Sequence, residues 1–438
     1  MITNRVPCKA SSRTLKPLST VCSRNTSLEA ASQRSYYTID FVQYSETTLL
    51  LFTALKVTKE QRIVIKILRN YKDTRFNLET PAKRLQCQLN ALQLNAKYTN
   101  QVYIGIAPIY STRLSQKPRQ IALGKIIKDP HVSALDPTIE YALLMHELPK
   151  ERQLDSLLMK ETPEALLGYL CGLSTYIGHM HKRLKPLSAC DKDGIRWGSC
   201  KQLEEKLQHN LDFFKEVLPI WKYTQSASYE RLESIFRRAS KILREVLHQP
   251  WYRKYFEQRM RKGCIKCCHG DLKAAHTWIL PYDPDPQTGD IPQGRIQILD
   301  AVDFNPNYNN IDMLSDFAML IVDIQAHMES PDLVNPMIES YLRAIEQDNS
   351  FSRTVLAYYL VEKALIGIIV NTLYDERTDL ALSFLNVLEM RVKKLEAHRW
   401  CVPFRAGKHV FFRIQQHLAK LLPPSLCIMA PPGTRPRA

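Results

Sequence analysis

The stretch from Cys268 to Asp316 constrains the fold of this 438-residue chain more than any other. It opens with the loop His269-Gly270-Asp271 and a short β-prone run. Residues 281–294 are rich in Pro, Asp and Gly, and the alternating residues after them predict a half-buried strand that returns and ends at Asp300. Such a hairpin brings Asp271 and Asp300 together, so that one carboxylate can accept a proton and the other can hold a divalent metal on a phosphate.

This block resembles the catalytic centre of the aminoglycoside phosphotransferase and choline kinase family, relatives of the protein kinases. His269-Gly270-Asp271 matches the family's loop letter for letter, Leu299-Asp300 resembles its metal-site strand, and Asp316-Phe317-Ala318 resembles the element that follows. A chance turn in which Asp271 caps a helix is the alternative, but three elements in order are more specific than one tripeptide. Segments 100–104 and 141–158 resemble a divergent bacterial branch of the family.

The resemblance implies a two-lobed, protein-kinase-like α+β fold and transfer of the γ-phosphate of ATP to a small molecule. In that setting Asp271 is the catalytic base and Asp300 binds Mg²⁺ on the phosphates. Asp303 rivals Asp300 as the metal ligand, because Asp303-Phe304-Asn305 resembles the Asp-Phe-Gly motif of protein kinases. Lys273 resembles a lysine that steadies the transferred phosphate, and a surface lysine is the alternative interpretation.

His276 departs from the family pattern, which carries an asparagine metal ligand five residues after the base. Imidazole is a softer ligand than an amide oxygen and suits Mg²⁺ poorly. His276 therefore favours Mn²⁺, a site with a single metal, or a site that has lost turnover and keeps nucleotide binding at most.

Residues 36–148 predict a β-rich N-lobe made of a small antiparallel sheet. The third predicted strand carries Lys66 among apolar neighbours, where a buried ammonium needs an anion. Val64-Ile65-Lys66 resembles the strand lysine that binds the ATP phosphates in protein kinases. An edge-strand lysine that faces water is the alternative.

A helix that begins near Pro81 should follow this strand. Kinase-like folds place a glutamate on this helix to pair with the strand lysine. Here the expected inward positions are Gln88, Asn90 and Gln93. The ion pair between strand and helix is therefore predicted to be missing.

The last predicted strand of the N-lobe ends at Met145, and a short polar segment with Glu147 leads to Pro149. This pattern is typical of the hinge between a β lobe and a helical lobe, where backbone groups near Met145 and Glu147 would bind the adenine of ATP. From 149 to 422, apolar residues three and four apart predict a mostly helical C-lobe that carries the catalytic hairpin 268–316.

The formal charge of +16 and the pI near 9.3 favour acidic partners such as nucleotides, phosphorylated substrates, RNA or an anionic membrane surface. No dense basic block with interleaved aromatics occurs, so nucleic acid is not the expected partner. The sequence contains no run of 18 apolar residues, so a transmembrane segment is not predicted. Eleven cysteines, an odd number without a secretory signal, predict reduced thiols and a cytoplasmic location. No pattern predicts an oligomeric state.

Residues 1–35 are basic, rich in Ser and Thr, and without apolar periodicity, which predicts a disordered tail. A transit peptide has the same composition. Residues 410–422 predict a basic amphipathic helix packed on the protein, with a membrane-surface helix as the alternative, and residues 423–438 predict a frayed end.

The favoured functional interpretation is an ATP-dependent phosphotransferase that acts on a hydroxyl or amine of a small-molecule acceptor. The alternative is a catalytically weak or inactive kinase-like protein that binds nucleotides or serves as a scaffold. A third interpretation is a basic RNA- or membrane-associated protein on the same frame.

Overall fold

The structure is a computed structural model. It describes residues 34–45, 47–53, 62–73, 77–115, 117–131, 135–187, 190, 194, 196–282, 291–292, 294–328, 333–374 and 377–398. The helix predicted for 410–422 and the tails predicted for 1–35 and 423–438 lie outside these residues, except for Arg34 and for Ser35, which already begins the first strand. One compact unit extends to Leu395, and the remaining residues form a separate unit of which only the last helical turn is described.

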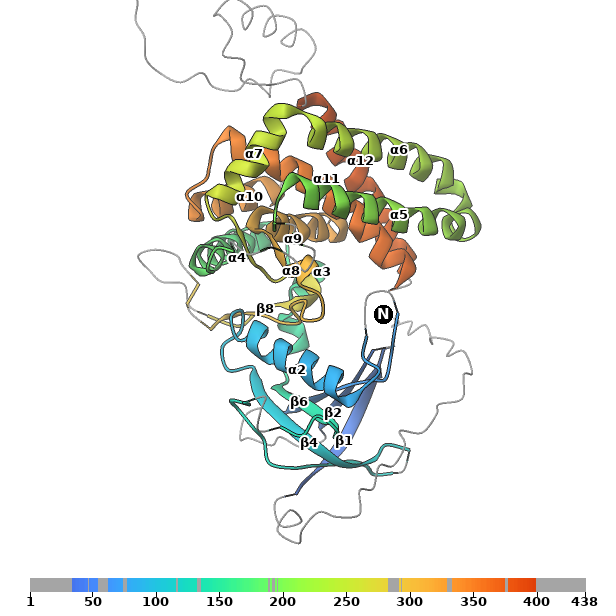
Figure 1. The fold of residues 1–438 in the computed structure, drawn as a ribbon, viewed down its shortest axis with the longest axis vertical. Helices are drawn as coiled ribbons and strands as arrows, with labels where there is room; N and C mark the ends of the chain where they lie inside the picture. The colour runs from blue at the N-terminus through green and yellow to red at the C-terminus, as the bar shows by residue number, and fades with distance from the viewer. Residues whose placement is uncertain are drawn as a thin grey trace, which may run out of the picture. The chain divides into compact units, whose positions relative to one another are not determined.

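Six antiparallel strands form the sheet of the N-terminal half (Figure 1). β1 pairs with both β2 and β5, so the order β1-β2-β3-β6-β4-β5 closes on itself. Apolar side chains such as Ile39, Leu51 and Leu144 fill the interior. The strands are β1 (Ser35–Tyr44), β2 (Thr48–Thr53), β3 (Ile63–Leu68), β4 (Tyr103–Arg113), β5 (Arg119–Leu123) and β6 (Tyr141–His146).

Lys66 lies on a central strand, because β3 pairs with β2 on one side and with β6 on the other. The edge-strand alternative is therefore wrong. Ile65 and Ile67 point into the closed sheet, whereas Val64 packs on its outer face against the following helix. Side chains alternate along a strand, so Lys66 shares the outer face with Val64.

Helix α2 (Pro81–Asn95) covers this outer face (Figure 1). Thr80 caps the helix by accepting a hydrogen bond from the Lys83 amide, and proline occupies the first turn. Gln88 is buried, as predicted, and donates from Nε2 to the Tyr141 carbonyl at 2.9 Å. The prediction for Gln93 is wrong: it is exposed, because Leu94 and Asn95 form the buried side of the last turn.

The C-terminal half is helical, and its two central helices, α9 and α11, are buried on most of their surface. Helix α11 is long and apolar enough to cross a membrane, but most of it is buried inside the protein; no other described helix passes that test. The helices are α3 (Leu154–Lys160), α4 (Pro163–Arg183), α5 (Cys200–Thr224), α6 (Ser226–His248), α7 (Pro250–Arg261), α8 (Pro306–Asn309), α9 (Met313–His327), α10 (Val334–Ala344), α11 (Ser350–Leu373) and α12 (Thr378–His398).

The predicted hairpin is present: β8 (Thr277–Ile279) pairs antiparallel with β9 (Ile296–Ile298). The half-buried character predicted for the returning strand is wrong, because Gln297 is only 2% exposed. Its Oε1 accepts a hydrogen bond from the Asn100 amide at 2.7 Å, so the polar side chain is satisfied inside the protein. A second pair, β7 (Ile265–Cys267) with β10 (Asn310–Asp312), flanks the loop that carries Asp271.

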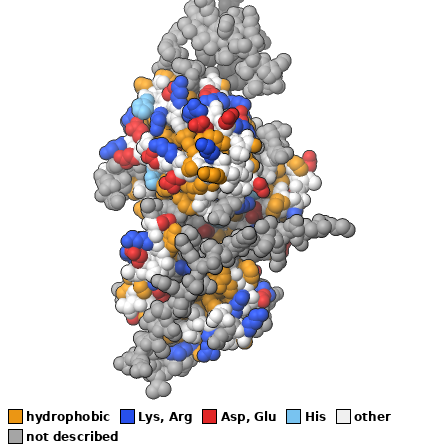
Figure 2. Space-filling view, turned by 90° about the vertical axis from the view of Figure 1, so that its right-hand side faces the viewer, with side chains coloured by type: hydrophobic (Ala, Val, Ile, Leu, Met, Phe, Trp, Pro, Cys, Tyr) orange, Lys and Arg blue, Asp and Glu red, His pale blue; other side chains and the backbone are white. Residues whose placement is uncertain are grey.

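The predicted α+β architecture, a small antiparallel N-terminal sheet followed by a helical C-terminal region, is confirmed. On the face shown in Figure 2, described basic and acidic side chains are interspersed with apolar ones. The positive charge of the chain is therefore not gathered into one block on the described part of that face.

A buried ion pair between Arg259 and Asp312 joins α7 to the start of α9. Nη2 of Arg259 lies 2.8 Å from Oδ1 of Asp312, and both side chains are 1% exposed. The same carboxylate caps α9 by accepting from the Leu314 amide at 2.8 Å. Loss of either partner would leave a buried charge without compensation.

We expect Asp312→Ala to lower the free energy of unfolding by about 3–5 kcal/mol, because it strands the Arg259 guanidinium in the interior. Glu257→Ala is the matched control, since it removes the partner of the exposed Arg261 and should cost less than about 1 kcal/mol. Urea unfolding of both variants measures the difference. Equal losses of unfolding free energy in the two variants would show that the buried ion pair stabilises the protein no more than the exposed one.

Candidate active site

The loop that carries Asp271 is held by a carboxylate from the helical core. Asp316 of α9 accepts hydrogen bonds from the backbone amides of His269 at 3.0 Å and Gly270 at 2.8 Å. Gly270 has φ +86°, and a Cβ there would lie 2.8 Å from the Tyr308 carbonyl oxygen. Only glycine therefore fits this bend without moving the backbone.

His269 fixes the spacing between the loop and the strand that ends at Asp300. Its Nδ1 accepts from the Asp271 amide at 3.3 Å, and its Nε2 donates to the Leu299 carbonyl at 2.9 Å. These partners assign a neutral ring protonated on Nε2. Burial lowers the pKa of His269, which agrees with that form.

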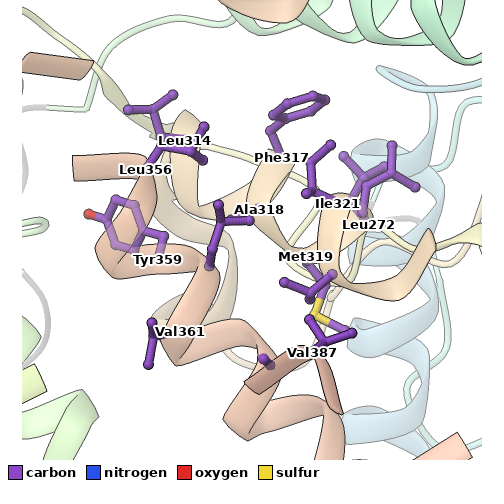
Figure 3. Close-up of a cluster of buried hydrophobic side chains, with 14 of the residues drawn as sticks. Leu272, Leu314, Phe317, Ala318, Met319, Ile321, Leu356, Tyr359, Val361 and Val387 are labelled. Atoms are coloured by element: carbon purple, nitrogen blue, oxygen red, sulfur yellow. The ribbon is translucent and has the colours of Figure 1, made fainter. Parts of the chain in front are cut away.

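Two further contacts hold the loop beyond Asp271. Leu272 is fully buried and lies beside Ile321 of α9 in the apolar cluster of Figure 3. The amide of Ala274 donates to Oδ2 of Asp323 at 2.7 Å. The Asp271 side chain thus projects from a backbone that is anchored on both sides.

Asp271 is held in its ionised form by its neighbours. Nζ of Lys273 lies 3.0 Å from Oδ2 of Asp271, whose side chain is 34% exposed. Burial alone would raise the pKa of Asp271, but the nearby Lys273 and His276 outweigh it and keep that pKa below its ordinary value. Because it is ionised, the Asp271 carboxylate is able to accept a proton.

His276 lies between the two aspartates that the sequence singles out. Its Nδ1 is 3.0 Å from the Asp271 carbonyl oxygen and 3.5 Å from Oδ2 of the same residue. Its Nε2 is 3.8 Å from Oδ2 of Asp300. Since a carbonyl only accepts, Nδ1 carries a proton, and Nε2 faces the Asp300 carboxylate. Such a pair of donor atoms suits a shared cation or a shared proton.

Asp300 follows β9 in a backbone conformation that few residues adopt, with φ +62°. Its Oδ1 lies 2.8 Å from Nζ of Lys66, so the hairpin and the N-terminal sheet meet in one ion pair. The Lys66 ammonium holds the pKa of Asp300 well below its usual range, even though burial opposes this shift. For Lys66 itself, burial lowers the pKa, but Asp300 and Asp303 outweigh burial and raise it.

Asp303 is a second carboxylate near the same lysine. Burial raises its pKa to about 6, Lys66 opposes that rise, and Asp300 adds to it. Sγ of Cys87 donates to Oδ1 of Asp303 at 3.5 Å, and Nδ2 of Asn90 donates to its carbonyl oxygen at 3.1 Å. Helix α2 therefore contacts this segment where kinase-like folds would supply a glutamate for the lysine.

The donor atoms fit a divalent cation. Asp300 and Asp303 carry two carboxylates beside the single ammonium of Lys66, which leaves negative charge and oxygen ligands of the kind that Mg²⁺ prefers. Nε2 of His276 beside Asp300 adds a nitrogen donor, which Mn²⁺ tolerates better than Mg²⁺ does.

These residues border a cavity of about 430 Å³. Thr47 and Thr48, at the start of β2, line it on the sheet side, and α5 and α11 line it on the helical side. The residues that contact it from the candidate site are Lys66, Asp271, Asp300 and Asp303. The cavity has room for the phosphate end of a nucleotide and for a small second molecule.

Met145 and Glu147, predicted to flank the adenine, are not among the residues that line this cavity. Met145 is buried in β6, and the Glu147 amide already donates to the Arg62 carbonyl at 2.9 Å. The structure thus brings together Lys66, Asp271, Lys273, His276, Asp300 and Asp303, and leaves the two hinge residues apart from them.

Several positioning residues carried no signal in the sequence. Cys87 and Asn95 are ordinary helix residues by pattern, yet Oδ1 of Asn95 accepts from the Ala301 amide at 3.0 Å beside Asp300. In the sequence, Asp323 is one polar residue in an apolar helix. A polar side chain buried in such a helix needs a hydrogen-bond partner, and this was the only signal for its contact with the loop.

The fold and the site together define a kinase-like frame: a lysine from a central strand paired with the aspartate that ends a hairpin, beside a second, loop-borne aspartate. Among solved structures, this chain is similar to choline kinase from Cryptosporidium parvum, with 12% identity over 84% of this chain and 91% of that one and a TM-score of 0.45. It is similar to the GDP complex of aminoglycoside 2'-phosphotransferase-IIIa, with 10% identity over 84% and 95% and a TM-score of 0.42. Glucosamine kinase in complex with glucosamine, ADP and inorganic phosphate matches at 11% identity over 82% and 93%, with a TM-score of 0.38.

These structures include members of the family that the sequence resembles. With TM-scores below 0.5, they add nothing to the geometry described above. No protein-family model matches the chain, and neither does any curated protein sequence.

We expect Lys66→Met to destabilise the protein more at pH 8 than at pH 5. In the wild type, the depressed pKa of Asp300 contributes stability above the unfolded-state value of about 3.9, and this contribution is lost as the pH falls. Without the ammonium, the pKa values of Asp300 and Asp303 both rise, so the variant loses stability as the pH rises through them. Because the Asp300 side chain is 56% exposed, solvent screens the effect to about 1 kcal/mol or less.

Urea unfolding at both pH values measures this difference. Lys72→Met, which removes an exposed lysine paired with Glu79, is the control and should show little dependence on pH. A Lys66→Met profile that is parallel to the wild type would mean that the ion pair does not couple to folding.

Proposed function

We propose that this protein belongs to the aminoglycoside phosphotransferase and choline kinase family and is an ATP-dependent phosphotransferase. It would move the γ-phosphate of ATP to a hydroxyl or amine of a small molecule. One observation carries this proposal: the 2.8 Å ion pair of Lys66 with Asp300, which His276 links to Asp271 at the same cavity. A lysine, a metal-binding carboxylate and a base are the parts that phosphoryl transfer requires.

Asp300 would hold the divalent cation, with Asp303 and Nε2 of His276 as further donors. When bound, the cation supplies charge neutralisation on the phosphate oxygens of ATP. Lys66 would bind the same phosphates once its ammonium turns from Asp300 toward them. The oxygen donors support Mg²⁺, and the imidazole favours Mn²⁺.

Asp271 would orient the acceptor hydroxyl and take its proton. The hydroxyl oxygen forms a bond to the γ-phosphorus, the bond from that phosphorus to the β,γ-bridging oxygen breaks, and ADP leaves. A placed base contributes about 10²–10⁴ in rate. Lys273, 3.0 Å from Asp271, would keep the carboxylate ionised and steady it until the acceptor arrives. His269 and Asp316 act only by holding the backbone of the loop.

Two observations favour the second candidate, a kinase-like protein with weak or no turnover. Among the described residues, α2 offers no carboxylate to Lys66, and Asp300 occupies the lysine instead. The Glu147 amide, a predicted adenine contact, is already used by Arg62. Binding without turnover would fit a nucleotide-binding or scaffolding role.

We expect Asp271→Asn to lower kcat for phosphoryl transfer about 10²–10⁴-fold and to leave ATP binding within about twofold, because the base acts on the acceptor and not on the nucleotide. Asp212→Asn on the exposed side of α5 is the control and should match the wild type. Release of ADP with a panel of small alcohols and amines gives kcat, and thermal shift with ATP gives binding. Equal, slow ADP release by the wild type and Asp271→Asn would favour the second candidate.

We expect the wild type to bind ATP more tightly with Mn²⁺ than with Mg²⁺, and His276→Asn to reverse that order. An amide oxygen in place of Nε2 offers Mg²⁺ the ligand it prefers. Isothermal titration with each metal measures the two affinities, and His179→Asn at an exposed position of α4 is the control. An unchanged preference in His276→Asn would mean that His276 does not contact the cation.

A further inference from the structure

The wall of the cavity on the helical side carries basic residues. Two helices of the C-terminal half, α5 and α11, form this wall. Lys206 and His209 line it from α5, and Lys363 lines it from α11. None of these three residues belongs to the motifs that carry the family resemblance. The wall borders the same cavity as Asp271, so a molecule seated against it shares the cavity with the candidate base.

The packing of the two helices places these basic residues at about the same level. Near the start of α5, Glu204 lies close to Tyr358 of α11: burial raises the pKa of that phenol, and nearby acidic groups that include Glu204 add to the rise. Toward the other end, Nε1 of Trp221 donates to Oγ1 of Thr372 at 2.9 Å. The helices therefore run side by side in the same direction, and their basic residues meet at one part of the cavity.

Lys363 is the unusual residue of this wall. It is the only basic residue from position 354 to the end of α11, a helix that is otherwise almost apolar. The residue is half-buried, and it forms no hydrogen bond and no ion pair with any described residue. An ammonium group loses favourable hydration when protein surrounds it, so such a group is normally paired with an anion. Lys363 instead borders the cavity, where its charge is available to a ligand.

The carboxylates at the other end of the cavity already lie beside cations. Nζ of Lys273 is 3.0 Å from Asp271, and Nζ of Lys66 is 2.8 Å from Asp300. On the helical wall, Glu362 is the one acid among the lining residues of α5 and α11, and two lysines line the same wall. The wall therefore keeps a surplus of positive charge. The formal charge of +16 on the whole chain adds to the attraction of anions.

Two neutral groups on α5 add hydrogen-bond donors beside these charges. The ring of His209 stands edge to face on Phe213, with ring centroids 4.6 Å apart, and both residues line the cavity. Asn210, the next residue, lines it as well. An imidazole N–H and an amide NH₂ both donate to the oxygens of a phosphate or a carboxylate, and such bonds are stronger than those between neutral groups.

We propose that Lys363, Lys206 and His209 bind an anionic group of the phosphoryl acceptor. The acceptor is then a small molecule that carries a hydroxyl together with a phosphate or a carboxylate. This inference rests on the proposed function only for the fate of the hydroxyl, because anion binding is a property of the cavity wall itself. Asn210 would donate a further hydrogen bond to the same group.

Four compounds with one three-carbon skeleton test the proposal on the full-length protein. They are glycerol 3-phosphate, glycerate, glycerol and 3-aminopropane-1,2-diol, which carry a phosphate, a carboxylate, a hydroxyl or an ammonium group beside the same two hydroxyls. Isothermal titration without nucleotide should give at least one anionic compound a Kd about 10- to 100-fold below that of glycerol. The ammonium compound should bind no more tightly than glycerol. Comparison of the two anionic compounds tells a phosphate site from a carboxylate site.

Lys363→Met keeps the apolar stem of the side chain and removes its charge, so it should abolish the preference for the anionic compounds. Lys363→Arg keeps the charge and should retain most of the preference. Lys222→Met, at an exposed position of α5 outside the cavity lining, removes the same charge and should bind the four compounds as the wild type does. The affinity of Lys363→Met for ATP should stay within about twofold of the wild type, because the site proposed for the ATP phosphates is at Lys66 and Asp300.

Failure of this inference and failure of the proposed function give different results. Anionic compounds that bind no more tightly than glycerol, or an anion preference that survives in Lys363→Met, would overturn the acceptor assignment even if neutral alcohols are phosphorylated. Loss of ATP binding in Lys363→Met would assign the lysine to the nucleotide and would also overturn it. Anion-selective binding that depends on Lys363, without any ADP release, would keep the anion site and remove the enzyme.

Thermal unfolding separates a binding role of Lys363 from a structural one. Lys363→Met should melt at or above the temperature of the wild type, since it removes a half-buried charge that has no partner among the described residues. A clear fall in the melting temperature of Lys363→Met, with none in Lys363→Arg, would show that the ammonium stabilises the fold and would overturn the proposal.

Discussion

The ion pair between Lys66 and Asp300 is the contact on which the candidate site depends. It joins a central strand of the N-terminal sheet to the end of a hairpin more than 230 residues further along the chain, at 2.8 Å. The Lys66 ammonium, whose side chain is 16% exposed, would be costly there without an opposite charge, because the protein around it replaces much of the water. The pair therefore fixes where the sheet meets the hairpin, and it sets the ionisation of both groups.

Around this pair, the charged residues are held by backbone contacts more than by one another. Asp316 binds two successive amides of the loop, His269 bridges the loop to the strand before Asp300, and Asn95 binds the amide after it. Each tether is a buried hydrogen bond that would leave an unsatisfied group if it were lost. Their combined effect is preorganisation, since the carboxylates need little movement to reach a phosphate.

The site also contains groups that the fold itself does not need. Asp303 has a raised pKa of about 6, and Asp300 adopts a left-handed backbone conformation. Each of these lowers stability, and together they border one cavity. Residues that lower stability gather at binding sites, because a bound ligand relieves their unfavourable interactions.

Much of this arrangement was predictable from the sequence, for identifiable reasons. Alternating apolar residues, turn residues and caps predict the strands, the hairpin and helix α2, since these depend on neighbours in the chain. The fold class followed from the motif block and from the order of the elements. The predictions failed where burial depends on distant segments: Gln297 was expected to be half exposed, and Gln93 was expected to point inward.

By itself, the sequence determined the order of the elements, the placement of Lys66 on a strand, and the spacing that carries Asp271 and Asp300 to opposite ends of one loop and hairpin. Only the tertiary structure decided that Lys66 pairs with Asp300, that His276 lies between the two aspartates, and that Glu362 borders their cavity. The physical reason is the distance along the chain over which each effect acts. Propensity and periodicity act over a few residues, whereas charge pairing and burial depend on which distant segments the packed core brings together.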